Sequence, residues 1–296
     1  GACGQCKAEL ISGEFEMGKH IDKAISEEEK AQGKVLLCCT TAKSDLKINV
    51  PGFNQNALPV RTLPARIENI EIKHDVALLK LALPKAPPFA FYAGQYIDLL
   101  LPGNISRSYS IANSPDQEDI LELHIRKREN GVCSEMIFGA EPKIKEKGIV
   151  RVKGPLGTFT LQQDSNKPMI LLATGTGYAP IRSILLDLIR QNSERQVHFY
   201  WGARQQADLY ALEEVEALIG RLKNAKFSPV LSKPDSDWKG ENGYVQNVAA
   251  QNYPDLSQYE VYACGSPAMT ESAQSLLTQK CALPEAAFFC DAFSPA

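Results

Sequence analysis

The feature that most constrains the fold is an apolar run, Met169–Ala173, that leads directly into the glycine-containing turn Thr174–Pro180. The turn is followed by apolar residues at the spacing of one helix face, namely Ile181, Ile184, Leu185 and Leu188. A strand buried on both faces, a glycine turn and a covering helix form the repeating unit of a parallel α/β sheet. Similar runs recur at Val197–Tyr200, Phe227–Leu231 and Val261–Ala263. We therefore predict a parallel α/β nucleotide-binding domain over residues 164–296.

The preceding region, residues 65–163, contains short runs with strand character that are separated by Gly, Pro and Asn. These runs are Ala65–Ile72, Val76–Leu83, Gln95–Leu101, Arg107–Ile111, Ile120–Arg126 and Ile149–Val152. Short strands at this spacing are typical of an antiparallel β-barrel. Residues 57–64 include Pro59 and Pro64 and show no periodicity, so we predict a linker there.

The first 56 residues have the elements of only part of a domain. They are strands at Lys7–Ile11, Val35–Cys38 and Leu46–Val50, with a charged helical stretch at Ala24–Gln32. The predicted fold class is therefore multi-domain, combining α+β and α/β architecture.

Four of the eight cysteines fall within the first 39 residues, which indicates metal binding rather than a disulfide scaffold. Cys3 and Cys6 form a C-x2-C pair, and Cys38 follows. A plant-type [2Fe–2S] site uses C-x4-C-x2-C and a distant fourth cysteine. Three ligands fit this pattern, and we expect the missing one upstream of Gly1, five residues before Cys3. Cys39 is the alternative to Cys38 as the distant ligand. A zinc site is less suitable, because Cys38 and Cys39 are adjacent rather than spaced as a second pair for tetrahedral coordination.

A second motif, Arg107-Ser108-Tyr109-Ser110, combines a cation, an aromatic ring and two hydroxyl groups on one predicted strand. A flavin requires an aromatic wall, hydrogen-bond partners and an arginine for its phosphate. Further along, Gly131-Val132-Cys133-Ser134 precedes a segment that could begin a helix. The alternatives are an ordinary barrel strand with alternating polarity and a loop with a serine N-cap.

The order of these motifs resembles the ferredoxin–NADP reductase superfamily, in which Arg-x-Tyr-Ser and Gly-x-x-Ser bind FAD. The turn Thr174–Pro180 resembles the nicotinamide loop of that superfamily, and Cys264–Met269 matches its Cys-Gly-x-x-x-Met segment. The resemblance covers residues 65–296 and implies that Cys264 lies beside the nicotinamide. Asp291-Ala292-Phe293 resembles the terminal segment whose aromatic residue lies near the flavin.

The resemblance implies a set of site residues. Catalytic roles fall to Cys264 and Ser110. The implied cofactor-binding residues are Arg107, Ser108, Tyr109, Ser110, His124, Ile125, Arg126, Gly131, Val132, Cys133, Ser134, Gly175, Thr176, Gly177, Ala179, Pro180, Cys264, Gly265, Met269 and Phe293. The cluster ligands are Cys3, Cys6 and Cys38.

Within the superfamily, the chain looks most similar to the CDP-6-deoxy-Δ3,4-glucoseen reductases. The similarity is carried by Cys3–Lys7, Leu37–Cys39, Ala93–Asp98, Leu123–Lys127 and Tyr262–Ser266, among other segments. It implies a partial β-grasp ferredoxin domain, and electron transfer from NADH through FAD and the cluster to a pyridoxamine-phosphate sugar dehydrase. Thr174 departs from this family, which often has glycine there.

Other electron acceptors stay open. The reductase components of aromatic-ring dioxygenases and di-iron monooxygenases use the same domains, and a non-catalytic electron-transfer or redox-sensing subunit would keep flavin and cluster. NADH is expected, while Arg204 and Lys233 leave NADPH possible. A net charge of -3 without basic clusters argues against nucleic acid, and the apolar runs are too short to cross a membrane. We expect a cytoplasmic protein.

Overall fold

The computed structural model describes residues 1, 4, 6–50 and 58–293, except for the side chain of residue 23. The chain forms two compact units, residues 1–57 and residues 58–296, which we call the N-terminal unit and the C-terminal unit. Each is described by itself. Cys3, one of the expected cluster ligands, lies outside the described residues.

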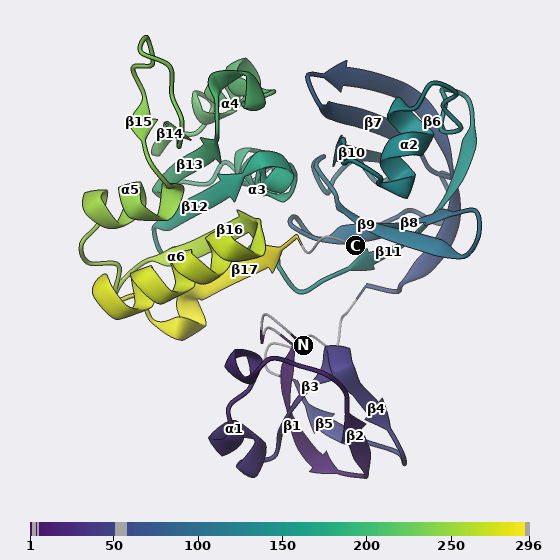
Figure 1. The fold of residues 1–296 in the computed structure, drawn as a ribbon, viewed down its shortest axis with the longest axis vertical. Coiled ribbons are helices and arrows are strands. Elements are labelled where there is room, and N and C mark those ends of the chain that lie inside the picture. The colour runs from purple at the N-terminus through teal and green to yellow at the C-terminus, as the bar shows by residue number, and fades with distance from the viewer. Residues whose placement is uncertain (2–3, 5, 51–57, 294–296) are drawn as a thin grey trace. The chain divides into compact units, whose positions relative to one another are not determined.

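The N-terminal unit is built on a three-stranded antiparallel sheet with β1 at its centre (Figure 1). Its strands are β1 (Lys7–Ser12), β3 (Lys34–Leu36) and β5 (Lys47–Asn49), with a second pair formed by β2 (Phe15–Met17) and β4 (Thr40–Ala42). Helix α1 (Glu27–Ala31) is shorter than the predicted stretch because Ser26 caps it in a capping box with Glu29. Ala24, Ile25 and Leu36 form a small core.

The first part of the C-terminal unit is a curled six-stranded antiparallel sheet in the order β10-β7-β6-β11-β8-β9. Its strands are β6 (Arg61–Lys73), β7 (Val76–Ala82), β8 (Tyr96–Leu101), β9 (Ile105–Ser110), β10 (Ile120–Arg126) and β11 (Ile149–Leu156). A bridge between Ile111 and Leu123 brings its two outer strands together, as the predicted barrel requires. Helix α2 (Val132–Phe138) covers one side, with Cys133 and Ile137 in the barrel core.

The predicted linker needs correction, because β6 begins at Arg61 and therefore includes Pro64. Pro64 stands opposite Arg151 of β11, whereas β7 pairs with β6 only from Arg66 onward. With a strand on only one side, the missing N–H of Pro64 is tolerated. Strand pairing thus extends the barrel into residues 61–64.

The second part of the C-terminal unit is a six-stranded parallel sheet in the order β15-β14-β13-β12-β16-β17. The strands are β12 (Met169–Thr174), β13 (Val197–Ala203), β14 (Ala225–Leu231), β15 (Glu241–Asn242), β16 (Glu260–Gly265) and β17 (Phe288–Ala292). The helices are α3 (Tyr178–Arg190), α4 (Leu212–Ile219), α5 (Val245–Asn252) and α6 (Pro267–Lys280). None of the described helices is long and apolar enough to cross a bilayer.

Alternate residues of the central strands serve two separate cores. Leu171 and Phe199 pack on the face covered by α3 and α4, whereas Leu172 and Tyr200 pack on the face covered by α5 and α6 (Figure 1). The chain passes from β12 to β13 on one side and later places β16 on the other side of β12. In open α/β sheets, ligands bind at the carboxyl ends of the strands where the order reverses in this way. The fold therefore directs a binding site to the ends of β12 and β16.

A buried ion pair joins the segment after the barrel to the parallel sheet. The side chains of Arg195 and Glu260 are 6% and 7% exposed, and Nη2 of Arg195 lies 2.7 Å from Oε2 of Glu260. Arg195 also donates to the carbonyl oxygens of Lys167 at 2.8 Å and Gln162 at 3.4 Å. One guanidinium thus binds the connection between β11 and β12 at two points, Gln162 and Lys167.

We predict that Arg195→Met lowers the free energy of unfolding by roughly 3–5 kcal/mol, because Glu260 keeps a buried charge without its cation. Urea denaturation followed by circular dichroism measures this loss. Lys223→Met is the matched control, since Lys223 and Glu194 form a pair whose side chains are 73% and 72% exposed. The control should denature as the wild type does. Equal midpoints for the two variants would show that the buried pair contributes nothing.

Candidate functional site

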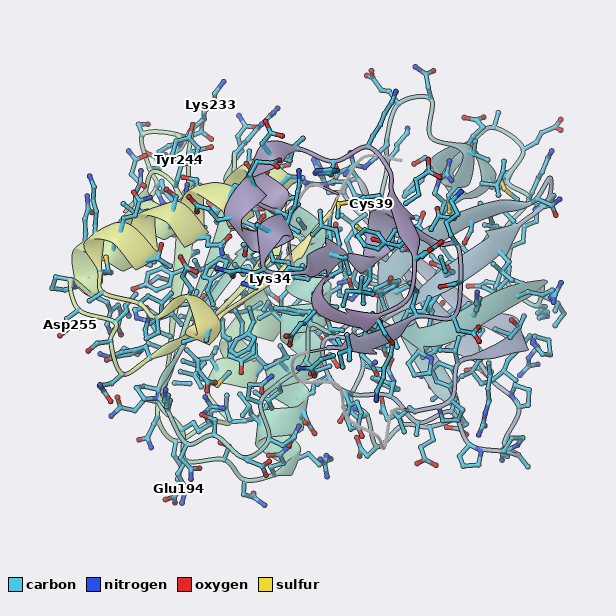
Figure 2. All side chains as sticks on the ribbon, turned by 90° about the horizontal axis from the view of Figure 1, so that it is seen from below. Lys34, Cys39, Glu194, Lys233, Tyr244 and Asp255 are labelled. Atoms are coloured by element: carbon cyan, nitrogen blue, oxygen red, sulfur yellow. The ribbon has the colours of Figure 1, made fainter. Side chains whose placement is uncertain are left out.

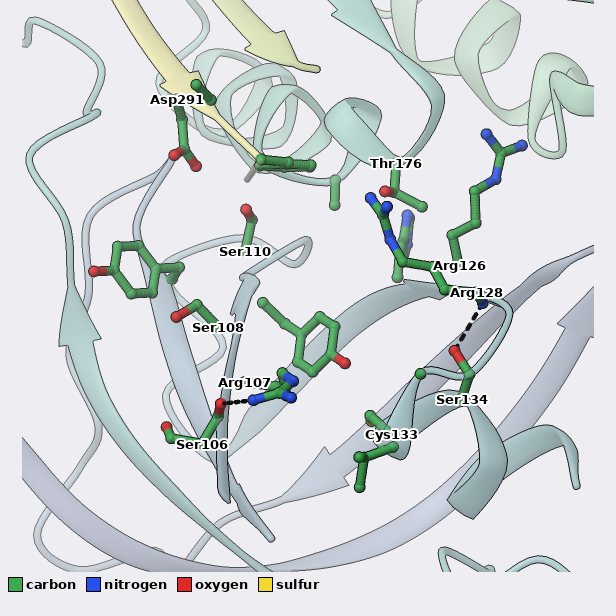
Figure 3. A pocket seen from close by; sticks show the side chains of 18 of the residues that line it. Ser106, Arg107, Ser108, Ser110, Arg126, Arg128, Cys133, Ser134, Thr176 and Asp291 are labelled. Atoms are coloured by element: carbon green, nitrogen blue, oxygen red, sulfur yellow. Dashed lines mark hydrogen bonds between the residues drawn. The ribbon is translucent and has the colours of Figure 1, made fainter. Parts of the chain in front are cut away.

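A pocket of about 460 Å³ opens in the C-terminal unit where the barrel meets the parallel sheet (Figure 3). Arginine, serine and tyrosine side chains from β9, β10 and the start of α2 line it from the barrel side. Thr176 and Ala179 line it from the glycine loop and α3, and Asp291, Ala292 and Phe293 from the end of β17. The strand ends identified by the sheet order therefore face the predicted flavin motif.

Strand β9 places the first motif in the pocket. It ends the strand order and pairs with β8 alone, so that Arg107, Ser108, Tyr109 and Ser110 all line the pocket. Arg107 donates to the carbonyl of Ser106 at 2.8 Å, which fixes the guanidinium at the edge of the strand (Figure 3). Burial raises the pKa of the Tyr109 hydroxyl, so this ring is neutral. It offers the aromatic surface on which a planar isoalloxazine could stack.

The cationic lining of the pocket comes from Arg107, Arg126 and Arg128. The backbone N–H of Arg128 donates to Oγ of Ser134 at 2.8 Å, which closes the Gly131–Ser134 turn (Figure 3). Arg126 is partly compensated by Asp75, whose carboxylate lies 2.9 Å from its Nε. Two less compensated guanidinium groups remain for an anionic ligand, and arginine binds phosphate oxygens in bidentate fashion. The lining thus fits a flavin with a pyrophosphate.

Asp291 contributes a carboxyl group to the pocket lining, opposite the arginines (Figure 3). Burial raises its pKa to about 6, and a hydrogen bond with Ser110 opposes that shift. The same carboxylate raises the pKa of Tyr96, although burial of the ring is the larger cause. Ser110 and Asp291 therefore form a pair that holds or releases a proton near neutral pH.

The glycine loop, which we define as Gly175–Gly177, is held by close backbone approach. A Cβ on Gly177 would lie 2.1 Å from the carbonyl oxygen of Cys264, so only glycine fits between the ends of β12 and β16. Gly175 has φ +55° and accepts a hydrogen bond from Nε1 of Trp201 at 3.0 Å. Thr174, where glycine was the family expectation, accepts from the N–H of Ser266 at 3.4 Å. Its hydroxyl therefore ties the loop to the next strand end.

Several expected site residues do not line the pocket. Ile125 is in the barrel core and Met269 in the core beside α6, because both side chains are apolar and point away from the cavity. Cys264 is fully buried, and its thiol donates to the carbonyl of Asp291 at 3.5 Å. The pocket lining also lacks four residues at the ends of β12 and β16 or in the first turn of α3, namely Gly175, Gly177, Pro180 and Gly265.

His124 lines the pocket but is bound to the nucleotide-binding part of the unit. Its Nδ1 lies 2.8 Å from the hydroxyl of Tyr210, and burial lowers its pKa to about 3. The imidazole is therefore neutral near pH 7. The His124 ring therefore forms a fixed part of the pocket surface and does not carry protons.

Two of the three expected cluster ligands lie together in the N-terminal unit. The backbone N–H of Cys38 points at Sγ of Cys6 at 3.4 Å, an N–H···S contact of the kind that tunes iron–sulfur clusters. Cys38 is exposed, whereas the thiol of Cys39 donates to the carbonyl of Leu36 at 3.6 Å. Cys39 is labelled on the N-terminal ribbon in Figure 2. This geometry favours Cys38 over Cys39 as the ligand.

Sequence reasoning missed six pocket residues, namely Tyr96, Ser106, Arg128, Asn130, Asp291 and Ala292. Asp291 belongs to the terminal segment Asp291–Phe293, in which the resemblance implies a role for the aromatic residue alone. The signal that finds it is strand register, since Asp291 stands beside Cys264 in the β16–β17 pair. Lys233, suggested for a 2′-phosphate and labelled in Figure 2, follows the end of β14. It is not among the residues that line the pocket.

Comparison with known proteins divides the chain into three parts. Residues 1–43 match the 2Fe-2S iron-sulfur cluster binding domain, residues 65–161 the oxidoreductase FAD-binding domain and residues 171–275 the oxidoreductase NAD-binding domain. The chain is 41% identical to CDP-6-deoxy-L-threo-D-glycero-4-hexulose-3-dehydrase reductase of Yersinia pestis, over 100% of this chain and 88% of that protein.

Two further proteins are similar over nearly the same span. The reductase component of propane 2-monooxygenase from Gordonia sp. is 33% identical, over 100% of this chain and 87% of that protein. The crystal structure of Amycolatopsis cytochrome P450 reductase GcoB has a TM-score of 0.84 at 30% identity, over 99% of this chain and 88% of that one. The fold and the order of the domains are therefore those of iron–sulfur flavoprotein reductases.

We predict that Asp291→Asn stabilises the flavin-free protein in a pH-dependent way. Between about pH 4 and pH 6 the folded protein keeps the Asp291 proton that the unfolded chain releases, so wild-type stability falls as pH rises through this window. Asparagine removes that loss. The stability difference should be near zero at about pH 4 and reach up to about 3 kcal/mol at about pH 7.

Urea denaturation at several pH values measures this difference. Asp255→Asn is the control, because Asp255 lies on the surface (Figure 2) and should give a difference that does not change over the same window. A constant difference for Asp291→Asn as well would mean that folding does not raise the pKa of Asp291.

Proposed function

Because this chain belongs to the ferredoxin–NADP reductase-like proteins with an N-terminal 2Fe-2S domain, we propose that its electron acceptor is a sugar 3-dehydrase. The chain is an NADH-dependent oxidoreductase in which electrons pass from NADH through FAD to a [2Fe–2S] cluster. The observation that carries the proposal is the identity to the Yersinia pestis dehydrase reductase along the whole chain, which exceeds that to the propane 2-monooxygenase component.

The proposed acceptor is a pyridoxamine-phosphate dehydrase that acts on a CDP-6-deoxy-hexulose. A plant-type cluster passes electrons one at a time at a potential of about −400 mV, low enough to reduce a demanding acceptor. An oxygenase component is the second candidate, favoured by the full-length similarity to the propane 2-monooxygenase reductase. The two candidates share every element of the pocket, so the acceptor itself must distinguish them.

We assign the pocket on β9 to FAD. Tyr109 and Phe293 offer aromatic surfaces, and Arg107 and Arg128 offer charge for the pyrophosphate. When bound, FAD supplies the chemistry that connects a two-electron hydride donor with a one-electron carrier. The glycine loop, whose Thr176 lines the pocket at the carboxyl ends of the strands, is assigned to NADH.

Ser110 is proposed as the residue that orients a proton at the site. Its hydroxyl lines the pocket and bonds to Asp291, so the pair can donate or accept a hydrogen bond according to the protonation of the carboxyl group. Cys264 lies behind this pair, with its thiol on the Asp291 carbonyl and its own carbonyl against Gly177. We propose that it sets the position of the loop and of Asp291, and that burial keeps it protonated.

The cluster is assigned to Cys3, Cys6 and Cys38. The backbone N–H of Cys38 points at the sulfur atom of Cys6 at 3.4 Å, which keeps these two assigned ligands next to one another. The non-catalytic alternative, a subunit that binds flavin without oxidising NADH, is disfavoured because the loop that would receive NADH is intact and packed against Cys264.

We predict that the purified protein, given NADH, supports turnover of a CDP-6-deoxy-L-threo-D-glycero-4-hexulose-3-dehydrase with its sugar nucleotide. The rate should be at least roughly tenfold above that with a propane 2-monooxygenase hydroxylase, a difference of about 1.4 kcal/mol in transition-state free energy. Deoxysugar product is quantified by chromatography against NADH consumed. Faster turnover with the hydroxylase would reverse the assignment. If NADH were oxidised but neither acceptor turned over, the family activity would stand and the proposed partner would be refuted.

We predict that Cys38→Ser removes the cluster absorbance and electron delivery to the acceptor, because a hydroxyl replaces a thiolate ligand. Reduction of bound FAD by NADH, followed by stopped-flow absorbance, should persist. Cys39→Ser is the matched control at the adjacent position and should keep cluster, flavin and delivery. Loss of the cluster in the Cys39 variant alone would exchange the two assignments.

A further inference from the structure

Arg182, on α3, joins the two parts of the C-terminal unit. Its side chain is 15% exposed, and its Nη1 donates both to the carbonyl of Ala112 and to Oε2 of Glu122, each at 2.7 Å. Its Nε donates to Oε1 of Glu214 at 2.8 Å. Ala112 and Glu122 belong to the barrel, whereas Glu214 belongs to α4. A single guanidinium is therefore bound to both parts.

The neighbouring residue makes a second bond across the same boundary. The hydroxyl of Ser183 donates to the carbonyl of Asn113 at 2.8 Å, and both residues are fully buried. Asn113 is itself fixed, since its side chain donates to the carbonyl of Ile120 and accepts from the N–H of Glu122, both at 2.9 Å. We call the bonds of Arg182 and Ser183 to the barrel the clasp. Its barrel side is rigid because each group there is hydrogen-bonded.

The residues of the clasp lie close in sequence to the pocket-lining strand β9 and to the glycine loop. Ala112 and Asn113 lie two and three residues after the end of β9 at Ser110. Arg182 is on the helix that begins directly after Gly177. Helix α3 carries the glycine loop at its start, so a shift of α3 moves the loop by a similar amount. The clasp therefore couples the position of the loop to that of the pocket-lining strand β9.

The residue type matters for this task. Arginine presents donors in a planar fork, which lets one side chain bind a carbonyl and two carboxylates at once. Lysine keeps the charge but has a compact ammonium group that cannot reach all three acceptors in this arrangement. A change to lysine therefore loosens the clasp without removing the cation from between Glu122 and Glu214.

We propose that Arg182 is a positioning residue for hydride transfer, which holds the nucleotide loop at a fixed distance from the flavin strand. The proposal rests on the assignment of FAD and NADH to the pocket made above. Misplacement of reacting groups by about 1 Å can cost roughly 100-fold in rate. A residue that serves only stability would instead change unfolding and leave the rate in the folded enzyme unchanged.

The test is Arg182→Lys in the full chain, with flavin and cluster bound. The rate of FAD reduction at saturating NADH, measured by stopped-flow absorbance, should fall roughly 10- to 100-fold. Flavin content and reduction of the same enzyme by dithionite should be unchanged, because neither requires the loop. The kinetic isotope effect with deuterated NADH should rise towards its limit as hydride transfer becomes the slowest step.

Arg190→Lys is the matched control. Arg190 lies on the same helix, is 47% exposed and pairs with Asp187 at 2.7 Å, and among the described residues it makes no bond to the barrel. This variant should reduce its flavin at the wild-type rate. An Arg182→Lys enzyme that is reduced as fast as Arg190→Lys would overturn the proposal.

Ser183→Ala is a second test variant, which is needed if Arg182→Lys fails to bind flavin or to fold. It removes one hydroxyl and one clasp bond, and it should slow FAD reduction severalfold with the same unchanged dithionite reduction. A wild-type rate in this variant would also overturn the proposal. If the wild-type enzyme itself were not reduced by NADH, the assigned function would fail first, so the two failures are distinguishable.

Discussion

The close approach of Gly177 to the Cys264 carbonyl is the contact on which the site depends. It brings the end of β12 against the end of β16, at the point where the strand order of the parallel sheet reverses. Any side chain at this position would separate the two ends, because a Cβ has no space there. The glycine loop, the start of α3 and the end of β17 take their places from this contact.

Charge organises the pocket that faces these strand ends. Arginines from β9 and from the turn before α2 provide positive potential, while Asp291 is the carboxyl group that lies closest to Ser110 among the pocket residues described. Burial makes the charged form of Asp291 costly. The site thus has a cationic region suited to phosphates. On the opposite side, Asp291 can bind a proton, because burial raises its pKa to about 6.

Two domains that bind different cofactors must keep a constant geometry if electrons are to pass between them. In the C-terminal unit this task falls to buried polar contacts rather than to apolar packing alone. Arg182 and Ser183 bind the barrel near β9, and Arg195 binds the segment that leaves the barrel. Buried hydrogen bonds are directional, so they specify one arrangement of the two parts where apolar surfaces would allow several.

Local patterns in the sequence determined the elements and the motif residues. The run Met169–Ala173 with its glycine turn predicted the nucleotide-binding strand and helix, and Arg107–Ser110 predicted the pocket-lining strand, because such motifs depend on residues close together in the chain. Only the tertiary structure showed that Asp291 lies beside Ser110, that Arg182 reaches Ala112 and Glu122, and that Pro64 belongs to a strand. These contacts join residues far apart in the sequence, and their register is set by strand pairing and packing, which no local pattern encodes.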